Sequence, residues 1–116
     1  MSFHFPKSEK LKSKKTIDLL FEEGKSFSKF PIKLLYIPVE NSDKTQAGFT
    51  VPKRNFNSAV DRNRLKRQVR EAYRLQKHLL KNKSGLKFAL MFLYIGKEKF
   101  PYAKIETAMK SLLKKL

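Results

Sequence analysis

The sequence predicts an α+β fold, a small two-layer α/β sandwich in which three helices pack on a sheet of about four strands. Three observations support this prediction. The chain has 116 residues, which fits a single domain spanning 1–116. Hydrophobic residues make up 41% of it, with ten Phe and four Tyr, enough for one small core. Helical and strand-like patterns also follow one another along the chain in an order that lets helices cover one face of a sheet.

The N-terminal region is predicted to contain a basic arm and a short helix. Residues 1–12 are mostly Lys, Ser, Phe and His, and we interpret them as an extended arm. A helix follows over 13–23, because Ile17, Leu20 and Phe21 recur at helical spacing. Gly24 is then a natural residue for the helix to end at.

Two strands are predicted next. The apolar stretch 32–39 is typical of a strand, and Pro38 near its end indicates an edge or a strand terminus. Residues 41–44 form a turn cluster of Asn, Ser, Asp and Lys. We therefore expect the short strand 47–51 to pair back on the first strand as a hairpin.

The C-terminal half is predicted to contain a long helix, a central strand and a final helix. The long helix covers 58–82, with Ser58 as its N-cap and a stop at the Ser-Gly pair 84–85. Residues 87–95 are nearly all apolar, which favours a central strand. Pro101 begins the final helix. Its apolar face comprises Ile105, Ala108, Met109, Leu112, Leu113 and Leu116.

The charge of the chain points to a polyanionic partner. The net charge is +17, from 27 Lys and Arg against 10 Asp and Glu, and self-repulsion of this size destabilises a lone compact domain. Nucleic acid is the commonest such partner, and a membrane surface is the next. The chain has no Cys, which excludes disulfides and Cys-based zinc sites. No apolar run approaches the length of a transmembrane helix and residues 1–15 lack the pattern of a secretory signal, so we expect a cytoplasmic protein.

The long helix concentrates its positive charge on one face. On a helical wheel, six basic side chains fall within roughly 140° of arc, and the arc contains no acid. These side chains are Arg62, Lys66, Arg67, Arg70, Arg74 and Lys77. Like charges this close cost stability unless a polyanion offsets them, and Arg suits bidentate contact with phosphate. A solvated charged face is the simpler alternative, but the absence of acid from the arc favours phosphate binding.

The same helix carries a family signature. Residues 59–74, AVDRNRLKRQVREAYR, contain every fixed position of the pattern A-V-x-R-N-x-x-K-R-x-x-R-E. This stretch resembles the Arg-Asn-Arg helix of the bacterial ribonuclease P protein component. The likeness extends in order along the chain: residues 11–24 resemble the first helix of that family, and residues 47–54 resemble the strand before its long helix.

The resemblance implies a fold, an activity and partners. The family fold has a left-handed βαβ crossover, and the protein joins a large catalytic RNA that removes 5′ leaders from precursor tRNA. Chemistry then belongs to the RNA and its Mg²⁺ ions, and the protein itself holds no cofactor or metal. The residues implied to contact the catalytic RNA are Lys53, Arg54, Arg62, Asn63, Arg64, Lys66, Arg67, Arg70 and Arg74.

The resemblance also implies a cleft for the leader between the first helix and the sheet. Phe21 and Tyr36 are assigned to it, together with Ile17, which stands where the family usually has Phe. Ile17 and Phe21 also have the spacing of core residues. Tyr36 alternates with its neighbours along a strand, so its ring is available for base stacking if the second face of the sheet is open.

The sequence leaves other functions to be weighed. The two His are far apart, no pair of carboxylates forms a recognisable acid and base, and no Gly-rich phosphate loop is present, so we expect no catalytic residue in the protein. A ribosomal RNA-binding protein shares the charge and size but not the Arg-Asn-Arg pattern. A DNA-binding helix needs a helix-turn-helix partner where 47–51 predicts a strand. A membrane-surface helix needs large hydrophobes opposite its basic face, where this helix offers only Leu65, Val69 and Ala72.

Overall fold

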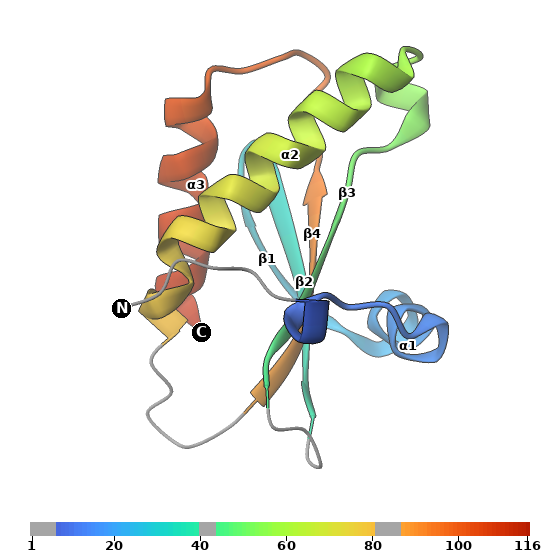
Figure 1. Cartoon of the computed structure of the whole chain (residues 1–116), viewed down its shortest axis with the longest axis vertical. Helices are drawn as coiled ribbons and strands as arrows, with labels where there is room; N and C mark the ends of the chain where they lie inside the picture. Colours follow the sequence, from blue (N-terminus) through green and yellow to red (C-terminus); the bar gives the residue numbers. More distant parts are fainter. Residues whose placement is uncertain (1–6, 40–43, 81–86) are drawn as a thin grey trace.

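The computed structural model describes residues 7–39, 44–80 and 87–116. Three α-helices and a four-stranded mixed sheet account for most of these residues (Figure 1). This confirms the predicted fold class. The strands are β1 (Lys25–Lys29), β2 (Ile32–Val39), β3 (Gln46–Thr50) and β4 (Lys87–Tyr94). The helices are α1 (Lys14–Glu23), α2 (Ala59–Gln76) and α3 (Tyr102–Lys115), with short 3-10 helices η1 (Lys7–Glu9), η2 (Lys53–Asn55) and η3 (Lys77–Leu80).

The sheet has the order β1-β2-β4-β3. β4 pairs antiparallel with β2 and parallel with β3, so the prediction of a central strand there is confirmed. The predicted hairpin between 32–39 and 47–51 is wrong, because β3 pairs with β4 and the hairpin partner of β2 is β1. β1 was not predicted, because only Phe27 among its five residues is partly buried and the strand has no apolar alternation to detect.

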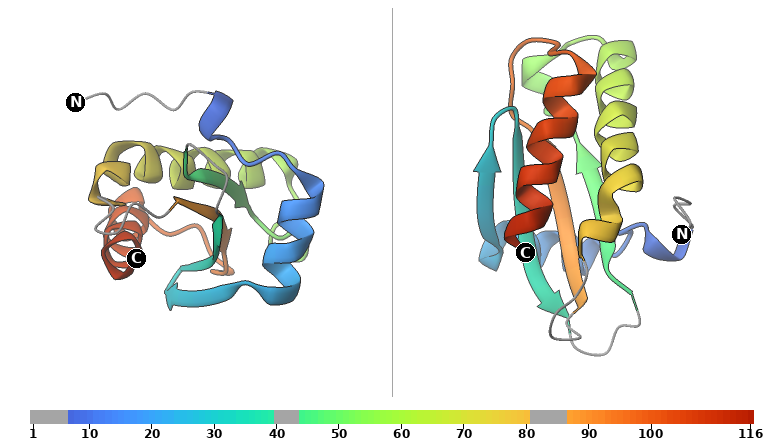
Figure 2. Two further views of the ribbon diagram at one scale, coloured as in Figure 1. Left: turned by 90° about the horizontal axis from the view of Figure 1, so that it is seen from below. Right: turned by 90° about the vertical axis from the view of Figure 1, so that its left-hand side faces the viewer.

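The parallel pair β3 and β4 is joined by α2. In the right-hand view of Figure 2, where the helices face the viewer, the chain rises through β3, returns through α2 and enters β4 on the left of β3. This is the left-handed sense, which is rare for such crossovers. It places α2 over the β3 edge of the sheet.

The two faces of the sheet carry separate apolar clusters. α2 and α3 cover one face and α1 lies across the other (Figure 1). The larger cluster, under α2 and α3, contains Leu34 and Phe92 from the sheet. The smaller cluster, under α1, contains Leu35 and Met91, the residues next to them in the chain. Because side chains alternate along a strand, β2 and β4 supply both clusters.

The predicted N-cap of α2 is confirmed, because Ser58 Oγ accepts a hydrogen bond from the backbone N–H of Asp61 at 3.3 Å. Ser13 caps α1 in the same way, accepting from the backbone N–H of Thr16 at 3.3 Å. α2 ends at Gln76 and continues as η3 to Leu80, and the stop predicted at 84–85 lies outside the described residues. The turn predicted at 41–44 also falls largely outside them. The apolar face predicted for the final helix is confirmed, with five of its residues buried.

Part of the predicted N-terminal arm docks against the edge of the sheet. The backbone N–H of Leu11 donates to the carbonyl of Ala47 at 2.9 Å, and the Leu11 side chain is buried. Glu9 forms an ion pair of 2.8 Å with Lys77 at the end of α2. Residues 7–12 are therefore held against β3 and α2, whereas residues 1–6 lie outside the described part of the chain. Within the described ranges, no helix is long and apolar enough to cross a membrane.

Gly24 joins α1 directly to β1. Its φ of −64° and ψ of 142° are open to other residues, so a left-handed turn does not explain the glycine. Steric hindrance explains it. A Cβ at this position would lie 2.3 Å from the carbonyl oxygen of Leu20, which accepts the hydrogen bond of the Gly24 N–H.

We predict that Gly24→Ala lowers the free energy of unfolding by about 1–3 kcal/mol, because backbone must move to admit the methyl group. Gly48→Ala is the matched control. The Cβ there would meet the end of the flexible Met91 side chain, at 2.9 Å from Cε, so the cost should be smaller. Urea unfolding of both variants tests this, and an equal or greater loss for Gly48→Ala would contradict it.

Candidate nucleic-acid interface

α2 presents a basic surface because its apolar stripe is buried against the sheet and α3. Leu65, Val69, Ala72 and Tyr73 are at most 2% exposed, which confirms the apolar stripe predicted for this helix. Most of the predicted RNA-contacting residues are exposed on the remaining surface. They are Asn63, Arg64, Lys66, Arg67 and Arg70 on α2, with Lys53 and Arg54 on η2.

The exposed cations of α2 lie on two sides of the helix. Lys66 and Arg70 line a groove toward α1. Arg64 and Arg67 line a hollow toward the start of α3. Gln68, Glu71 and Tyr102 complete its lining. The helix therefore offers phosphate-binding side chains to two different surfaces of the molecule. Arg67 lies on the other side from Lys66 and Arg70, although the helical wheel placed all three in one arc.

The groove toward α1 has basic walls and an apolar floor. We call it the α1 groove. Its cations come from the N-terminal segment and from α2, and its apolar residues come from the N-terminal segment, α1, β3 and β4. The lining residues are Lys10, Leu11, Lys12, Ile17, Ala47, Gly48, Phe49, Lys66, Arg70 and Met91, around a volume of about 360 Å³.

A second groove follows on the same face of the sheet. We call it the Arg54 groove, and it is lined by Lys33, Pro52, Arg54, Asn55, Leu93, Ile95 and Lys97. Met91 lies in the α1 groove and Leu93 in the Arg54 groove, and these two residues are successive on one face of β4. The two grooves are therefore neighbours along the strand, and each combines cations with apolar side chains.

Arg62 has a structural role that the sequence did not reveal. Its Nη1 donates hydrogen bonds to the carbonyl oxygens of Phe56 at 2.7 Å and Asn57 at 3.0 Å. These bonds tie the start of α2 to the linker that follows η2. Since η2 carries Lys53 and Arg54, Arg62 positions two other cations of the surface.

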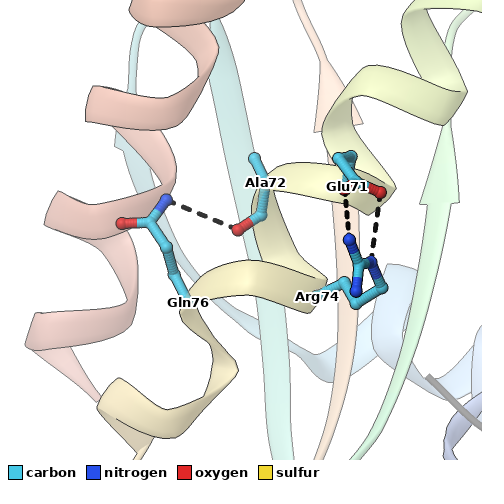
Figure 3. A network of polar contacts seen from close by, with 4 residues as sticks. All are labelled: Glu71, Ala72, Arg74 and Gln76. Carbon is cyan, nitrogen blue, oxygen red and sulfur yellow. Dashed lines mark hydrogen bonds and ion pairs between the residues drawn. The ribbon is translucent and has the colours of Figure 1, made fainter. Parts of the chain in front are cut away.

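Arg74 is also engaged within the protein. It forms a two-point ion pair with Glu71, one turn earlier on α2 (Figure 3). The hydrogen bond from Arg74 lowers the pKa of the Glu71 carboxyl below its ordinary value, and the charge of Arg74 adds to this effect. Close by, Gln76 Nε2 donates to the Glu106 carbonyl at 3.0 Å, which links α2 to α3. The predicted RNA-contacting role of Arg74 thus competes with an internal partner.

The structure separates the three residues that were predicted to bind a leader. Ile17 lines the α1 groove. Phe21 is on the same helix and is 54% exposed. Tyr36 is on the other face of the sheet, where it stacks on Phe27 with ring centroids 5.1 Å apart and packs against the cluster under α2 and α3. The prediction that Tyr36 lies in a cleft with Ile17 and Phe21 is therefore wrong.

The error at Tyr36 has a simple physical origin. Successive side chains of a strand point to opposite faces of the sheet, so an error of one residue in the predicted register moves a side chain to the wrong face. Leu35, not Tyr36, is the residue of β2 that packs under α1. Lys33, two residues before Leu35, faces the same way and reaches the Arg54 groove. Lys10 and Lys12 were predicted only as part of a basic arm, and Lys97 contributed only to the net charge, so none of the three was predicted to line a groove.

The described residues contain no group of three or more His, Asp or Glu side chains placed to hold a metal ion. The site consists of cations arranged around apolar grooves and along one helix. Such a surface binds phosphates and bases, and it defines the class of protein as an RNA-binding α/β sandwich.

Comparisons with known proteins identify the family. A family model described as Ribonuclease P matches residues 5–116. A ribonuclease P protein component from Porphyromonas gingivalis is 35% identical, with 97% of this chain and 87% of that protein covered. Another from Alkaliphilus metalliredigens is 30% identical, with 94% of each covered. The chain belongs to the ribonuclease P protein component family, and it is therefore a subunit of an endoribonuclease that acts in tRNA processing.

Solved structures agree with this assignment. The ribonuclease P protein from Thermotoga maritima superposes with a TM-score of 0.77 at 26% identity, covering 93% of this chain and 97% of that one. The protein from Staphylococcus aureus has a TM-score of 0.76 at 19% identity, covering 91% and 93% of the two chains, and supports the fold.

We predict that Arg62→Ala lowers the free energy of unfolding by about 1–3 kcal/mol, because two charge-assisted hydrogen bonds to backbone carbonyls are lost. Arg67→Ala is the matched control, since Arg67 is exposed on the same helix and a surface change of this kind costs at most about 0.5 kcal/mol. Urea unfolding compares them, and equal stabilities would show that Arg62 has no positioning role.

Proposed function

We propose that this protein binds the catalytic RNA of ribonuclease P through α2 and holds the single-stranded 5′ leader of precursor tRNA along the sheet face that carries α1. The observation that carries this proposal is the pair of neighbouring grooves on that face, each with cations around an apolar floor. Assisted by these contacts, the holoenzyme removes the leader and produces the mature 5′ end of the tRNA.

A single strand suits these grooves better than a duplex. Single-stranded RNA exposes both its phosphates and the faces of its bases, and proteins bind it with basic tracks next to flat apolar side chains. In the α1 groove, Lys66 and Arg70 would meet phosphates while Ile17 contacts a base. In the Arg54 groove, Lys33, Arg54 and Lys97 would continue the track.

The catalytic RNA is assigned to the outer side of α2. Arg64 and Arg67 face away from the α1 groove, and Asn63 is exposed beside them. Cations here would reduce the repulsion that arises when precursor tRNA approaches the catalytic RNA. Mg²⁺ would be held and used by the RNA, and the protein would lower the concentration that the complex requires.

Reconstitution tests the function as a whole. We predict that the protein, mixed with a bacterial ribonuclease P RNA at a Mg²⁺ concentration too low for the RNA alone, restores cleavage of a precursor tRNA. The protein without that RNA should not cleave, because the proposal assigns the chemistry to the RNA. Cleavage by the protein alone would contradict the proposal, as would a failure to stimulate the RNA.

Salt dependence tests the electrostatic part. With about five side chains on phosphates, a plot of log affinity for the catalytic RNA against log salt should have a slope of roughly −4. Replacing Arg64 and Arg67 together with Ala should reduce its magnitude by about 1.5. Lys110 and Lys114, exposed on α3, are the control pair, and their replacement with Ala should leave the slope unchanged.

Leader binding is tested by the preference for precursor over mature tRNA. We predict that Lys33→Ala with Lys97→Ala reduces this preference several-fold, because two phosphate contacts to the leader are lost. Binding of the catalytic RNA should change little. Tyr36→Phe, on the other face of the sheet, should keep the full preference. A preference that survives the double replacement would remove the Arg54 groove from the leader path.

A further inference from the structure

An exposed aromatic side chain stands at the turn between β1 and β2. Phe30 is 51% exposed, and it is one of the four exposed large hydrophobic residues in the described part of the chain. Its ring meets Phe100 edge to face, with centroids 5.2 Å apart. The ammonium of Lys104 lies 5.5 Å from the Phe30 centroid and 4.6 Å from the Phe100 centroid. We call Phe30, Phe100 and Lys104 the hairpin-tip patch.

The patch is held in place by the structure around it. The Phe100 N–H donates to the Tyr94 hydroxyl at 3.0 Å, and that hydroxyl donates to the Glu98 carbonyl at 2.5 Å. Gly96 lets the Phe100 ring come close, because a Cβ there would lie 2.9 Å from Phe100 Cε2. The backbone N–H of Ile95 donates to the Pro31 carbonyl at 2.8 Å and thereby ties the hairpin turn to the end of β4. A fixed aromatic ring loses little entropy when a ligand stacks on it.

The patch continues the surface of α2. A hollow lined by Arg64, Leu65, Gln68, Lys99, Phe100 and Pro101 connects the outer side of α2 to Phe100. Lys104 and Lys99 are exposed, although Lys99 also meets Asp61 at 3.2 Å. Arg64 and Lys99 thus line the same hollow as Phe100.

We propose that the hairpin-tip patch binds an unpaired nucleotide of the catalytic RNA, with the base stacked on Phe30 and the adjoining phosphate on Lys104. The combination of an exposed ring and neighbouring cations is complementary to a nucleotide, whose base has a flat face and whose phosphate is negative. The patch lies on the α2 and α3 side, so the catalytic RNA is the expected source and the leader is not. This inference rests on the proposed binding of the catalytic RNA through α2.

The chain has no Trp, which allows a direct test. Phe30→Trp places a single Trp in the patch, and its fluorescence should change when ribonuclease P RNA is added and saturate at one protein per RNA. Leu19→Trp is the matched control, because Leu19 is 39% exposed on α1, across the sheet from α2 and α3. Its fluorescence should change much less.

Affinity measurements complete the test. Phe30→Ala and Phe30→Leu should weaken binding of the catalytic RNA by at least about fivefold, whereas Phe30→Tyr should bind within twofold of the original protein, because only the aromatic face is needed. Thermal unfolding of each variant confirms that the fold is retained.

Two results would overturn the proposal. If the fluorescence of Phe30→Trp does not change while a filter-binding assay shows that the RNA is bound, the patch contacts no nucleotide. The proposed function then stands without it. If its fluorescence responds to precursor tRNA and not to the catalytic RNA, the assignment to the catalytic RNA is wrong.

Discussion

The burial of the apolar stripe of α2 is the interaction on which the rest of the site depends. Leu65, Val69, Ala72 and Tyr73 fill the space over the sheet and against α3, and this fixes the rotation of the helix about its axis. With the stripe fixed, the cations between and beyond these residues must project to the two sides of the helix. The left-handed crossover sets α2 over the β3 edge, so one side reaches around to the opposite face of the sheet.

The second face of the sheet is only partly covered, and this creates the grooves. α1 packs through Leu20 on Leu35 and Met91, and the N-terminal segment adds Leu11 beside β3. Between these elements and α2 the α1 groove remains, and beyond α1 the Arg54 groove continues along β4. A polyanion bound there would also relieve part of the repulsion within a chain of net charge +17.

The sequence predicted those features that local patterns determine. The approximate bounds of α1, the start of α3, the cap at Ser58 and the central strand could be derived from periodicity and capping chemistry. β1 could not, because its residues are mostly exposed, and the partner of β3 could not, because strand pairing depends on the path of α2. The internal hydrogen bonds of Arg62 and Arg74 could not be predicted either, since their acceptors are set by backbone geometry and by the side-chain rotamer.

In the function proposed above, the leader and the catalytic RNA occupy different faces of one small protein. The chain has no Cys, so single-Cys variants can carry a photo-crosslinker at one chosen position. In the holoenzyme with precursor tRNA, a crosslinker at Lys12→Cys or Lys97→Cys should attach to the leader, and one at Lys104→Cys should attach to the catalytic RNA. Leader crosslinks from position 104, or catalytic-RNA crosslinks alone from positions 12 and 97, would contradict this division.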